Sequence, residues 1–218
     1  MQVFNLLGSV NMRARLAFHR PSLFVSLLTF FLTLAASAHF SFSQNDSNKI
    51  RNFGQINENY FRGGQPDAEH FALLKRMGIK TVIDLQKDPK DKEKSWVQNA
   101  GMKYVQIPLS TTRPATAEQT EYFLQLVNDP DNLPVFVHCA AGKHRTGEMT
   151  AIYRITHDSW SADRAYAEMK KYGYYSFPNH GSLKDYVFIY HENYQRAVKK
   201  GNMAPKPVPE PAQTQTAF

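Results

Sequence analysis

The sequence predicts an α/β fold with a mostly parallel central sheet flanked by helices. Two observations support this prediction. Short apolar runs typical of buried strands alternate with segments whose apolar residues recur at helical spacing. Capping and stop signals separate the two kinds of segment, and strands separated by helices pair in parallel through crossover connections. In a sheet of this kind, a ligand site is expected beyond the carboxyl ends of the strands.

The first predicted elements follow this alternation. Residues 51–66 contain two short runs around Asn57-Glu58-Asn59, which is typical of a β-hairpin. A helix is expected to open at Asp67 and to stop at Gly78, because glycine favours the end of a helix. A buried strand over residues 80–85 follows.

The middle of the chain repeats the pattern. A short helix over residues 92–101 precedes a strand over residues 103–107. Thr116 and Gln119 form a capping box that opens the next helix. Its predicted buried face consists of Tyr122, Phe123, Leu126 and Val127. An apolar strand over residues 134–138 then leads to three helices, which are expected near Thr146, after Ser161 and around residues 183–190.

The N-terminus is expected to be a targeting segment. In residues 1–38, basic side chains precede an apolar run that is about as long as the core of a signal peptide. An Ala-Ser-Ala tripeptide at its end fits a small-x-small cleavage site. Cleavage would make the chain secreted or periplasmic, and an uncleaved membrane anchor is the alternative. Met1 and Met12 are both candidate starts.

The rest of the chain divides into three parts. Residues 39–48 are polar and are interpreted as a linker, and residues 49–200 as the folded domain. Residues 201–218 alternate proline with polar residues and are expected to be disordered. The net charge of +7 is partly due to the N-terminal arginines. A mild positive field suits small anions, and the lack of a dense basic stripe argues against a nucleic-acid partner.

The segment "VFVHCAAGKHRTGEM" contains the only cysteine of the chain, Cys139. It directly follows the strand over residues 134–138, where this fold class places its chemistry. The next five residues form a tight loop whose backbone N–H groups can surround an anion, and a helix N-terminus follows. These phosphate-binding residues are Ala140, Ala141, Gly142, Lys143 and His144. The same field favours the thiolate form of the cysteine, which is the nucleophilic form.

Three neighbours complete this predicted site. Arg145 offers a planar fork to two phosphate oxygens, and it cannot lose its charge. The hydroxyl of Thr146 can donate to the sulfur. His138 is expected to orient the loop. Arg62 and Gln65 are interpreted as stabilising a turn, with a role in lining the cleft as the alternative.

The string "HCAAGKHRTG" resembles the signature loop of cysteine-dependent protein tyrosine and dual-specificity phosphatases. "YFRGGQPDAEHFALLKRMGIKTVIDL" looks like the N-terminal block of compact bacterial members. The chain is also similar to atypical fungal and plant dual-specificity phosphatases that act on inositol pyrophosphates and share "GKHRTG". The resemblance covers residues 52–194 and implies a phosphatase α/β sandwich. It implies that Cys139 is the nucleophile, Arg145 the phosphate clamp and Thr146 the hydroxyl partner. No metal and no cofactor are expected.

The sequence departs from the family at the general acid. Typical members carry an aspartate on the loop after the preceding strand, but residues 107–119 contain none. Glu118 is the nearest carboxyl group, and Asp88 and Asp91 lie on an earlier loop. Three alternatives remain: a substitute acid, a substrate with a good leaving group, or slow turnover.

The predicted function is a cysteine-dependent phosphatase that acts through a phosphocysteine intermediate on a phosphomonoester or a phosphoanhydride. The substrate is a phosphorylated protein, an inositol phosphate or another small phosphate. A rhodanese-like sulfurtransferase is one alternative, although the Arg-Thr-Gly and the following helix argue against it. A pseudophosphatase that binds phosphate without turnover is the other.

Overall fold

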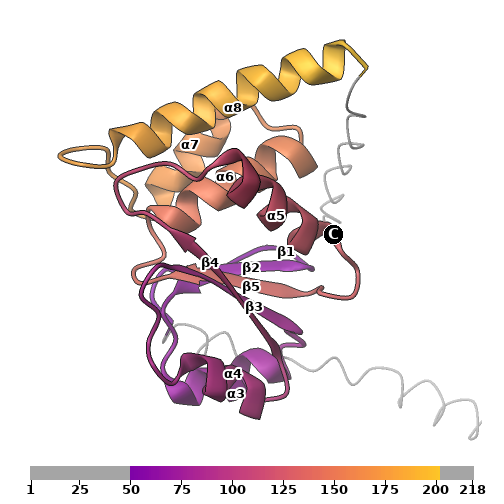
Figure 1. Cartoon of the computed structure of the whole chain (residues 1–218), viewed down its shortest axis with the longest axis vertical. Coiled ribbons are helices and arrows are strands. Elements are labelled where there is room, and N and C mark those ends of the chain that lie inside the picture. Colours follow the sequence, from indigo (N-terminus) through magenta and orange to yellow (C-terminus); the bar gives the residue numbers. More distant parts are fainter. Residues whose placement is uncertain (1–49, 202–218) are drawn as a thin grey trace, which may run out of the picture. The chain divides into compact units, whose positions relative to one another are not determined.

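The computed structural model describes residues 50–201 and places a five-stranded sheet at their centre (Figure 1). The strand order is β1-β2-β5-β3-β4. The first pair is antiparallel and forms the predicted hairpin, and all other pairs are parallel, which confirms the predicted mostly parallel sheet. The strands are β1 (Gly54–Asn57), β2 (Tyr60–Gly64), β3 (Thr81–Gln86), β4 (Lys103–Leu109) and β5 (Val135–Cys139).

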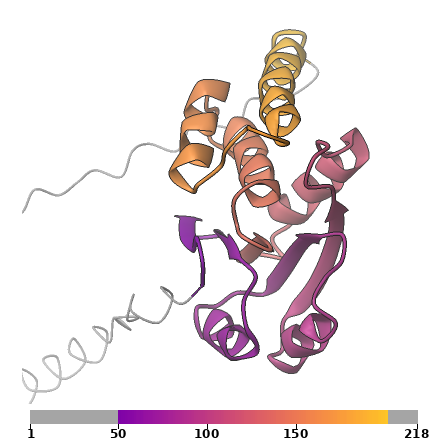
Figure 2. The ribbon, with the colours of Figure 1, turned by 90° about the vertical axis from the view of Figure 1, so that its left-hand side faces the viewer.

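Helices cover both faces of the sheet (Figure 2). They are α3 (Ala68–Arg76), α4 (Glu93–Asn99), α5 (Ala117–Asn128), α6 (Arg145–His157), α7 (Ala162–Lys171) and α8 (Gly181–Lys199). Helices α3 and α4 lie on one face, and α5 and α6 on the other, with α7 and α8 packed against α6 (Figure 1). This arrangement confirms the predicted α/β architecture.

The local signals act as the sequence predicts. Thr116 accepts the backbone N–H of Gln119, whose side chain returns to the Thr116 backbone, so the predicted capping box is present. Ser161 caps α7 by accepting the N–H of Arg164. Gly78 follows the C-cap of α3 and has a φ of +87°, a conformation that glycine adopts without strain.

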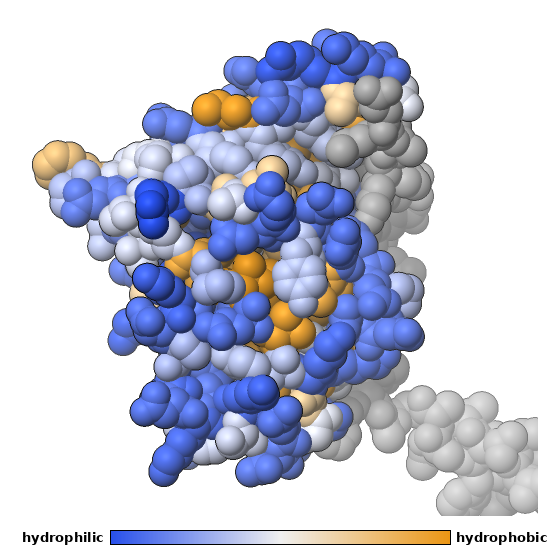
Figure 3. All heavy atoms as spheres, viewed as in Figure 1, coloured by the Kyte–Doolittle hydropathy of each residue, from blue (hydrophilic) through white to orange (hydrophobic). Residues whose placement is uncertain are grey.

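Apolar clusters on both faces hold the layers together. Phe71 and Phe136 belong to the cluster beneath α3 and α4, whereas Phe123 and Met149 belong to the cluster beneath α5 and α6. The prediction that Tyr122 is buried is wrong, because its side chain is 45% exposed. It lies beside the inward stripe that Phe123 and its helical neighbours form. Figure 3 shows apolar side chains gathered at the middle of one face, bordered by hydrophilic residues.

The sheet order decides where the cysteine loop emerges. Strand β5 lies between β2 and β3, so it pairs on both sides, and Cys139 at its end faces Gly64 of β2 in the register. No helix within residues 50–201 is both long and apolar enough to span a bilayer. The expected signal peptide (1–38), the linker (39–48) and, from residue 202 on, the expected tail lie outside the described residues.

Candidate active site

The loop after β5 joins the sheet to helix α6. Cys139 is the last residue of β5, Arg145 is the first residue of α6, and the cysteine is 3% exposed. Gly142 has a φ of +68°, and a Cβ atom there would lie 2.6 Å from the backbone of Gly63 and Gly64. Only glycine fits both the conformation and the space, so the loop packs directly on the end of β2.

The surroundings of the Cys139 sulfur favour the thiolate. Burial alone would raise the pKa of this thiol. It is nevertheless lowered, because the hydroxyl and the backbone N–H of Thr146, the charge of Arg145 and the N–H of Gly142 all stabilise the anion. A buried thiolate surrounded by donors is a poised nucleophile.

Arg145 and Thr146 start helix α6 at this position. Arg145 is buried, and its Nη1 lies 3.4 Å from the carbonyl oxygen of Leu85, at the end of β3. The Thr146 hydroxyl also lies 3.5 Å from the carbonyl oxygen of Gly63. The structure thus brings Cys139, Arg145 and Thr146 together where β2, β3 and β5 end.

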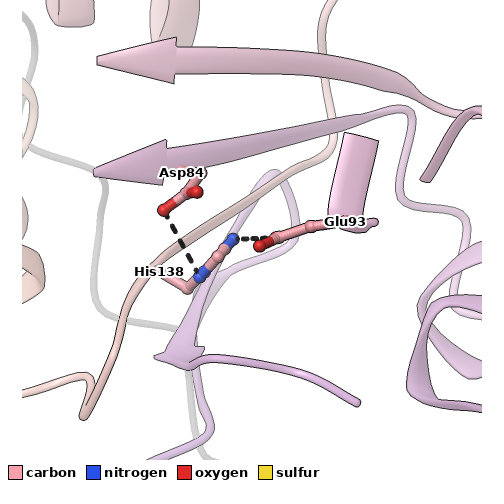
Figure 4. Close-up of side chains that lie close together, drawn as sticks. All are labelled: Asp84, Glu93 and His138. Carbon is pink, nitrogen blue, oxygen red and sulfur yellow. Dashed lines mark ion pairs between the residues drawn. The ribbon is translucent and has the colours of Figure 1, made fainter. Parts of the chain in front are cut away.

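His138 is held between two carboxylates, as Figure 4 shows. Its Nε2 lies 2.8 Å from Oε1 of Glu93 and its Nδ1 lies 3.9 Å from Oδ1 of Asp84, and all three side chains are fully buried. Burial would lower the pKa of His138, but the contact with Glu93 and the charges of Glu93 and Asp84 raise it. The raised pKa favours the protonated imidazole next to Cys139 in the sequence, and Glu93 holds this ring at Nε2.

The same three side chains are the group in residues 50–201 that could hold a metal ion, since one donor atom of each lies within 4.8 Å of the others. The ring geometry favours another role. Its two nitrogens face different carboxylates, whereas an ion would occupy one nitrogen and draw both carboxylates to that side. A protonated imidazole between two carboxylates fits this arrangement.

Aromatic rings border the other side of the loop. The ring of His144 stacks on that of His180 with centroids 3.7 Å apart, and it meets Tyr175 edge-on at 4.4 Å. Nδ1 of His180 lies 2.7 Å from the carbonyl oxygen of Thr111, in the loop that lacks the family's aspartate. Burial and the charge of His180 lower the pKa of His144 to about 4, so His144 is neutral at pH 7.

The three candidate acids do not share one environment. Glu118 is fully exposed, and its pKa is lowered by its own backbone N–H and by the Thr116 side chain, so it is ionised at neutral pH. Asp88 and Asp91 are exposed on the loop between β3 and α4. Glu148 of α6 was not predicted. It is fully buried, accepts the N–H of Ala115 at 2.9 Å, and burial raises its pKa to about 8.

Sequence reasoning thus missed Asp84, Glu93 and Glu148. A signal pointed to two of them, Asp84 and Glu148. Asp84 is a carboxylate between the apolar residues Ile83 and Leu85 of a buried strand, and Glu148 lies within a helix that is buried along most of its length. A charged residue in such a position requires a partner. Glu93 gave no signal, because a glutamate at the start of a helix is common on protein surfaces.

Comparisons with known proteins agree with this geometry. Residues 35–184 match the family model described as "DSP-PTPase phosphatase fused to NAD+ Kinase". The dual specificity protein phosphatase TpbA of Pseudomonas aeruginosa is 32% identical over 123 residues, which are 56% of this chain and 55% of that protein. The inositol diphosphatase DSP2 of Oryza sativa is 31% identical over 101 residues, 44% of this chain and 50% of that protein. The chain spans about half the length of these two curated relatives.

A solved structure shows the same fold. The core catalytic domain of the PP-IP phosphatase SIW14 from S. cerevisiae superposes with a TM-score of 0.58 at 24% identity. The match covers 72% of this chain and 96% of that one. At this identity the likeness establishes the fold alone.

Proposed function

This chain belongs to the DSP-PTPase phosphatase family, and on that premise we propose that it is a cysteine-dependent phosphatase with Cys139 as its nucleophile. One observation carries the proposal. The pKa of this buried thiol is lowered by the hydroxyl and N–H of Thr146, the charge of Arg145 and the N–H of Gly142, the same groups that can receive a phosphate.

The proposed reaction has two steps. The Cys139 thiolate attacks phosphorus, the bond to the leaving oxygen breaks, and a phosphocysteine forms. Water then attacks the phosphocysteine, which releases phosphate and returns the thiolate. Arg145 and the N–H groups of residues 140–144 stabilise the charge on the transferring oxygens, and the Thr146 hydroxyl stabilises the sulfur as it leaves.

The test uses p-nitrophenyl phosphate and thiosulfate as substrates for one purified sample. We expect vanadate-sensitive phosphate release and no sulfur transfer. Cys139→Ser should abolish turnover while phosphate still binds, because the cradle is mainly backbone. Phosphate release by Cys139→Ser at the wild-type rate would exclude the cysteine mechanism, and thiosulfate turnover would favour a sulfurtransferase.

A second variant tests the clamp. Arg145→Lys keeps the charge but loses the planar fork, so we expect kcat to fall by about 10²-fold, as for the loss of a transition-state donor. Wild-type-like kinetics of this variant would assign Arg145 a structural role.

The absent aspartate favours a second candidate, a pseudophosphatase. The usual acid loop holds no aspartate, and Glu118 at its end is already ionised at neutral pH. A pseudophosphatase would bind vanadate without releasing p-nitrophenolate at a measurable rate, so the same assay separates the two functions.

The substrate is proposed as a phosphorylated protein or an inositol pyrophosphate, the classes that the names of the relatives indicate. A phosphoanhydride fits this site well, since its leaving phosphate needs little protonation. A phosphate-release screen with a phosphotyrosine peptide and an inositol pyrophosphate discriminates between the two classes.

We also propose that residues 1–38 direct export, so that the folded part is secreted or periplasmic. The basic residues, the apolar run and the Ala-Ser-Ala tripeptide support this proposal. Fractionation with N-terminal sequencing should find a mature chain that begins near His39. An uncut chain in the membrane would support the anchor, and an uncut chain in the cytosol would exclude export.

A further inference from the structure

The segment from Asn52 to Gln65 donates hydrogen bonds to the carbonyl oxygens of the loop after β5. Three successive carbonyls of the loop accept hydrogen bonds from this distant part of the chain. The contacts are Gln65 N–H to Ala140 O at 3.2 Å, Asn52 Nδ2 to Ala141 O at 2.8 Å, and Arg62 Nη2 to Gly142 O. The loop is therefore shaped from outside by residues that lie about 75 to 90 positions earlier in the sequence.

The planarity of the peptide bond gives these contacts a consequence. The C=O and the following N–H of a trans peptide point in opposite directions, so a carbonyl held outward turns the next N–H inward. Asn52 holds the carbonyl of Ala141, and the N–H of the same peptide, on Gly142, is one of the donors to the Cys139 sulfur. Arg62 acts in the same way on the peptide between Gly142 and Lys143.

Arg62 is a buried cation with an unusual environment. It is 0% exposed, and no carboxylate pairs with its guanidinium among the described ion pairs. Its Nε and Nη1 have no hydrogen-bond partner within residues 50–201, and the ring of Tyr172 covers it at 3.9 Å. Gly54 leaves the room for that ring, because a Cβ there would overlap the Tyr172 hydroxyl.

A buried guanidinium without a carboxylate partner destabilises a fold unless another anion compensates it. Burial lowers the pKa of Arg62, whereas Tyr60, Tyr172, Glu168 and Cys139, in that order, raise it, so the Cys139 thiolate is one of several negative groups that act on this guanidinium. A bound phosphate would add to that negative charge on the same side of the loop. The position of Arg62 thus suits the anions of the reaction.

Asn52 carries an independent signal. It is one of two non-glycine residues with positive φ in residues 50–201, at +51°. Asparagine tolerates this region better than most residues, but the conformation is strained for any side chain. A strained backbone that aims a side chain at a loop 89 residues away is typical of a position under functional constraint.

We propose that Asn52 and Arg62 are positioning residues, which hold the carbonyls of Ala141 and Gly142 outward and so direct the N–H groups of the loop at the thiolate and the phosphate. Arg62 also supplies a fixed positive charge behind the loop. This inference rests on the proposed phosphatase function. It replaces the interpretation of Arg62 as a turn-stabilising residue.

The first test replaces the cation with a side chain of similar length. Arg62→Met should raise the inhibition constant for vanadate roughly tenfold or more, the size of effect typical of groups that orient a first shell. It should also move the alkylation of Cys139 by iodoacetamide to higher pH. Its Tm should remain equal to that of the wild type or increase, because an uncompensated buried charge is removed.

Arg154→Met is the matched control. Arg154 is also largely buried, but unlike Arg62 it pairs with two carboxylates, those of Asp158 and Glu168. Its loss should lower the Tm and leave vanadate inhibition and thiol alkylation unchanged. If Arg62→Met lowers the Tm as this control does, and vanadate inhibition stays within twofold of wild type, Arg62 is structural and the inference is wrong.

The second test changes Asn52. This side chain is only half-buried, so its variants are expected to fold. Asn52→Gly relieves the positive φ but loses the donor, and Asn52→Asp places an acceptor against the carbonyl of Ala141. Both should weaken vanadate binding, Asp more than Gly. The control is Asn57→Asp in the same hairpin, where the amide donates to Tyr153 instead. Equal vanadate affinity in all three variants would overturn the role of Asn52.

The two levels of inference fail separately. If the wild type shows neither vanadate-sensitive turnover nor vanadate binding, the proposed function fails. If the wild type is active and vanadate-sensitive while the Asn52 and Arg62 variants behave like it, only the positioning role fails.

Discussion

At the scale of single residues, Glu93 sets the environment of His138, which precedes Cys139 in the sequence. Its carboxylate lies 2.8 Å from His138 in a site that excludes water, and its other oxygen accepts the amide of Gln65 at 2.7 Å. Without this carboxylate, burial would favour the neutral imidazole. The charge next to Cys139 therefore depends on a residue from a different element, helix α4.

We predict that Glu93→Gln shifts the alkylation of Cys139 by iodoacetamide to higher pH. The amide removes the charge that keeps His138 protonated, and a neutral His138 stabilises the neighbouring thiolate less. The measurement is the alkylation rate between pH 4 and pH 8. Glu69→Gln is the control, because the exposed Glu69 lies 4.0 Å from another buried histidine, His70. Superimposable profiles for Glu93→Gln and wild type would contradict the prediction.

The part of the candidate site that is contiguous in sequence could be predicted. His138 to Thr146 form one strand end, one loop and one helix start, so their proximity follows from local structure. Asp84, Glu93, Arg62 and Asn52 could not be assigned in this way. Their positions depend on which strands become neighbours, and apolar runs of similar length do not encode that order.

At the scale of elements, the loop over residues 110–116 is anchored on three sides. His180 contacts the carbonyl of Thr111, Ser182 donates to the carbonyl of Thr112 at 2.8 Å, and Glu148 accepts the N–H of Ala115. Through the stack of His180 on His144, the loop is also tied to the phosphate cradle. The loop is thus held in place, and it carries hydroxyl groups where the family has an aspartate.

The lack of an aspartate in residues 110–116 should affect how the rate depends on the leaving group. Because Ser110, Thr111 and Thr112 are poor acids, the leaving oxygen departs without protonation by the loop. We expect log kcat to fall steeply as the leaving-group pKa rises across a series of aryl and alkyl phosphates. A shallow dependence that becomes steep in Asp88→Ala or Asp91→Ala would identify that aspartate as the acid instead.

The buried carboxyl of Glu148 makes the anchoring sensitive to pH. Its pKa of about 8 in the fold lies above the ordinary glutamate value of 4.5, so the folded state binds this proton more tightly than the unfolded state. The contribution to stability is complete below the unfolded pKa and is lost as the pH rises towards 8. The slope in that window is at most about 1.4 kcal/mol per pH unit.

We therefore predict that Glu148→Gln is more stable than wild type at pH 8 and that the difference shrinks towards pH 5. The amide oxygen can still accept the N–H of Ala115, and glutamine has no proton to lose. Urea unfolding at several pH values measures the difference. A constant offset between the two proteins over this range would show that Glu148 is ionised in the fold.

At the scale of the whole molecule, the described part is a sheet between two helical layers, with the phosphate loop at the ends of its inner strands. The alternation of strands and helices predicted these layers and the hairpin. The strand order was not predictable, because the connection from β4 through α5 to β5 is equally compatible with an edge position. The central position of β5 depends on the apolar clusters that pack on both faces of the sheet, and these form only in the complete fold.

We predict that a chain of residues 49–201 keeps the kcat/KM of the full chain, whereas a chain that starts at residue 54 does not. The shorter chain loses Ile50, which is 3% exposed in the cluster under α3 and α4, and Asn52. Burial of one isoleucine contributes about 1.5–3 kcal/mol. Thermal unfolding and vanadate inhibition measure both effects. Equal Tm and vanadate affinity of the two chains would contradict the prediction.

The central position of β5 has a consequence for biosynthesis. Strands β2 and β3 have no ladder with each other, and each pairs with β5, which follows them by about fifty to seventy residues. During synthesis, β2 and β3 therefore each keep one edge with unpaired backbone N–H and C=O groups until Cys139 has left the ribosomal exit tunnel. Sheets with such distant partners fold slowly and expose unpaired edges in the meantime. The nascent chain is thus most prone to aggregation just before Cys139 is synthesised.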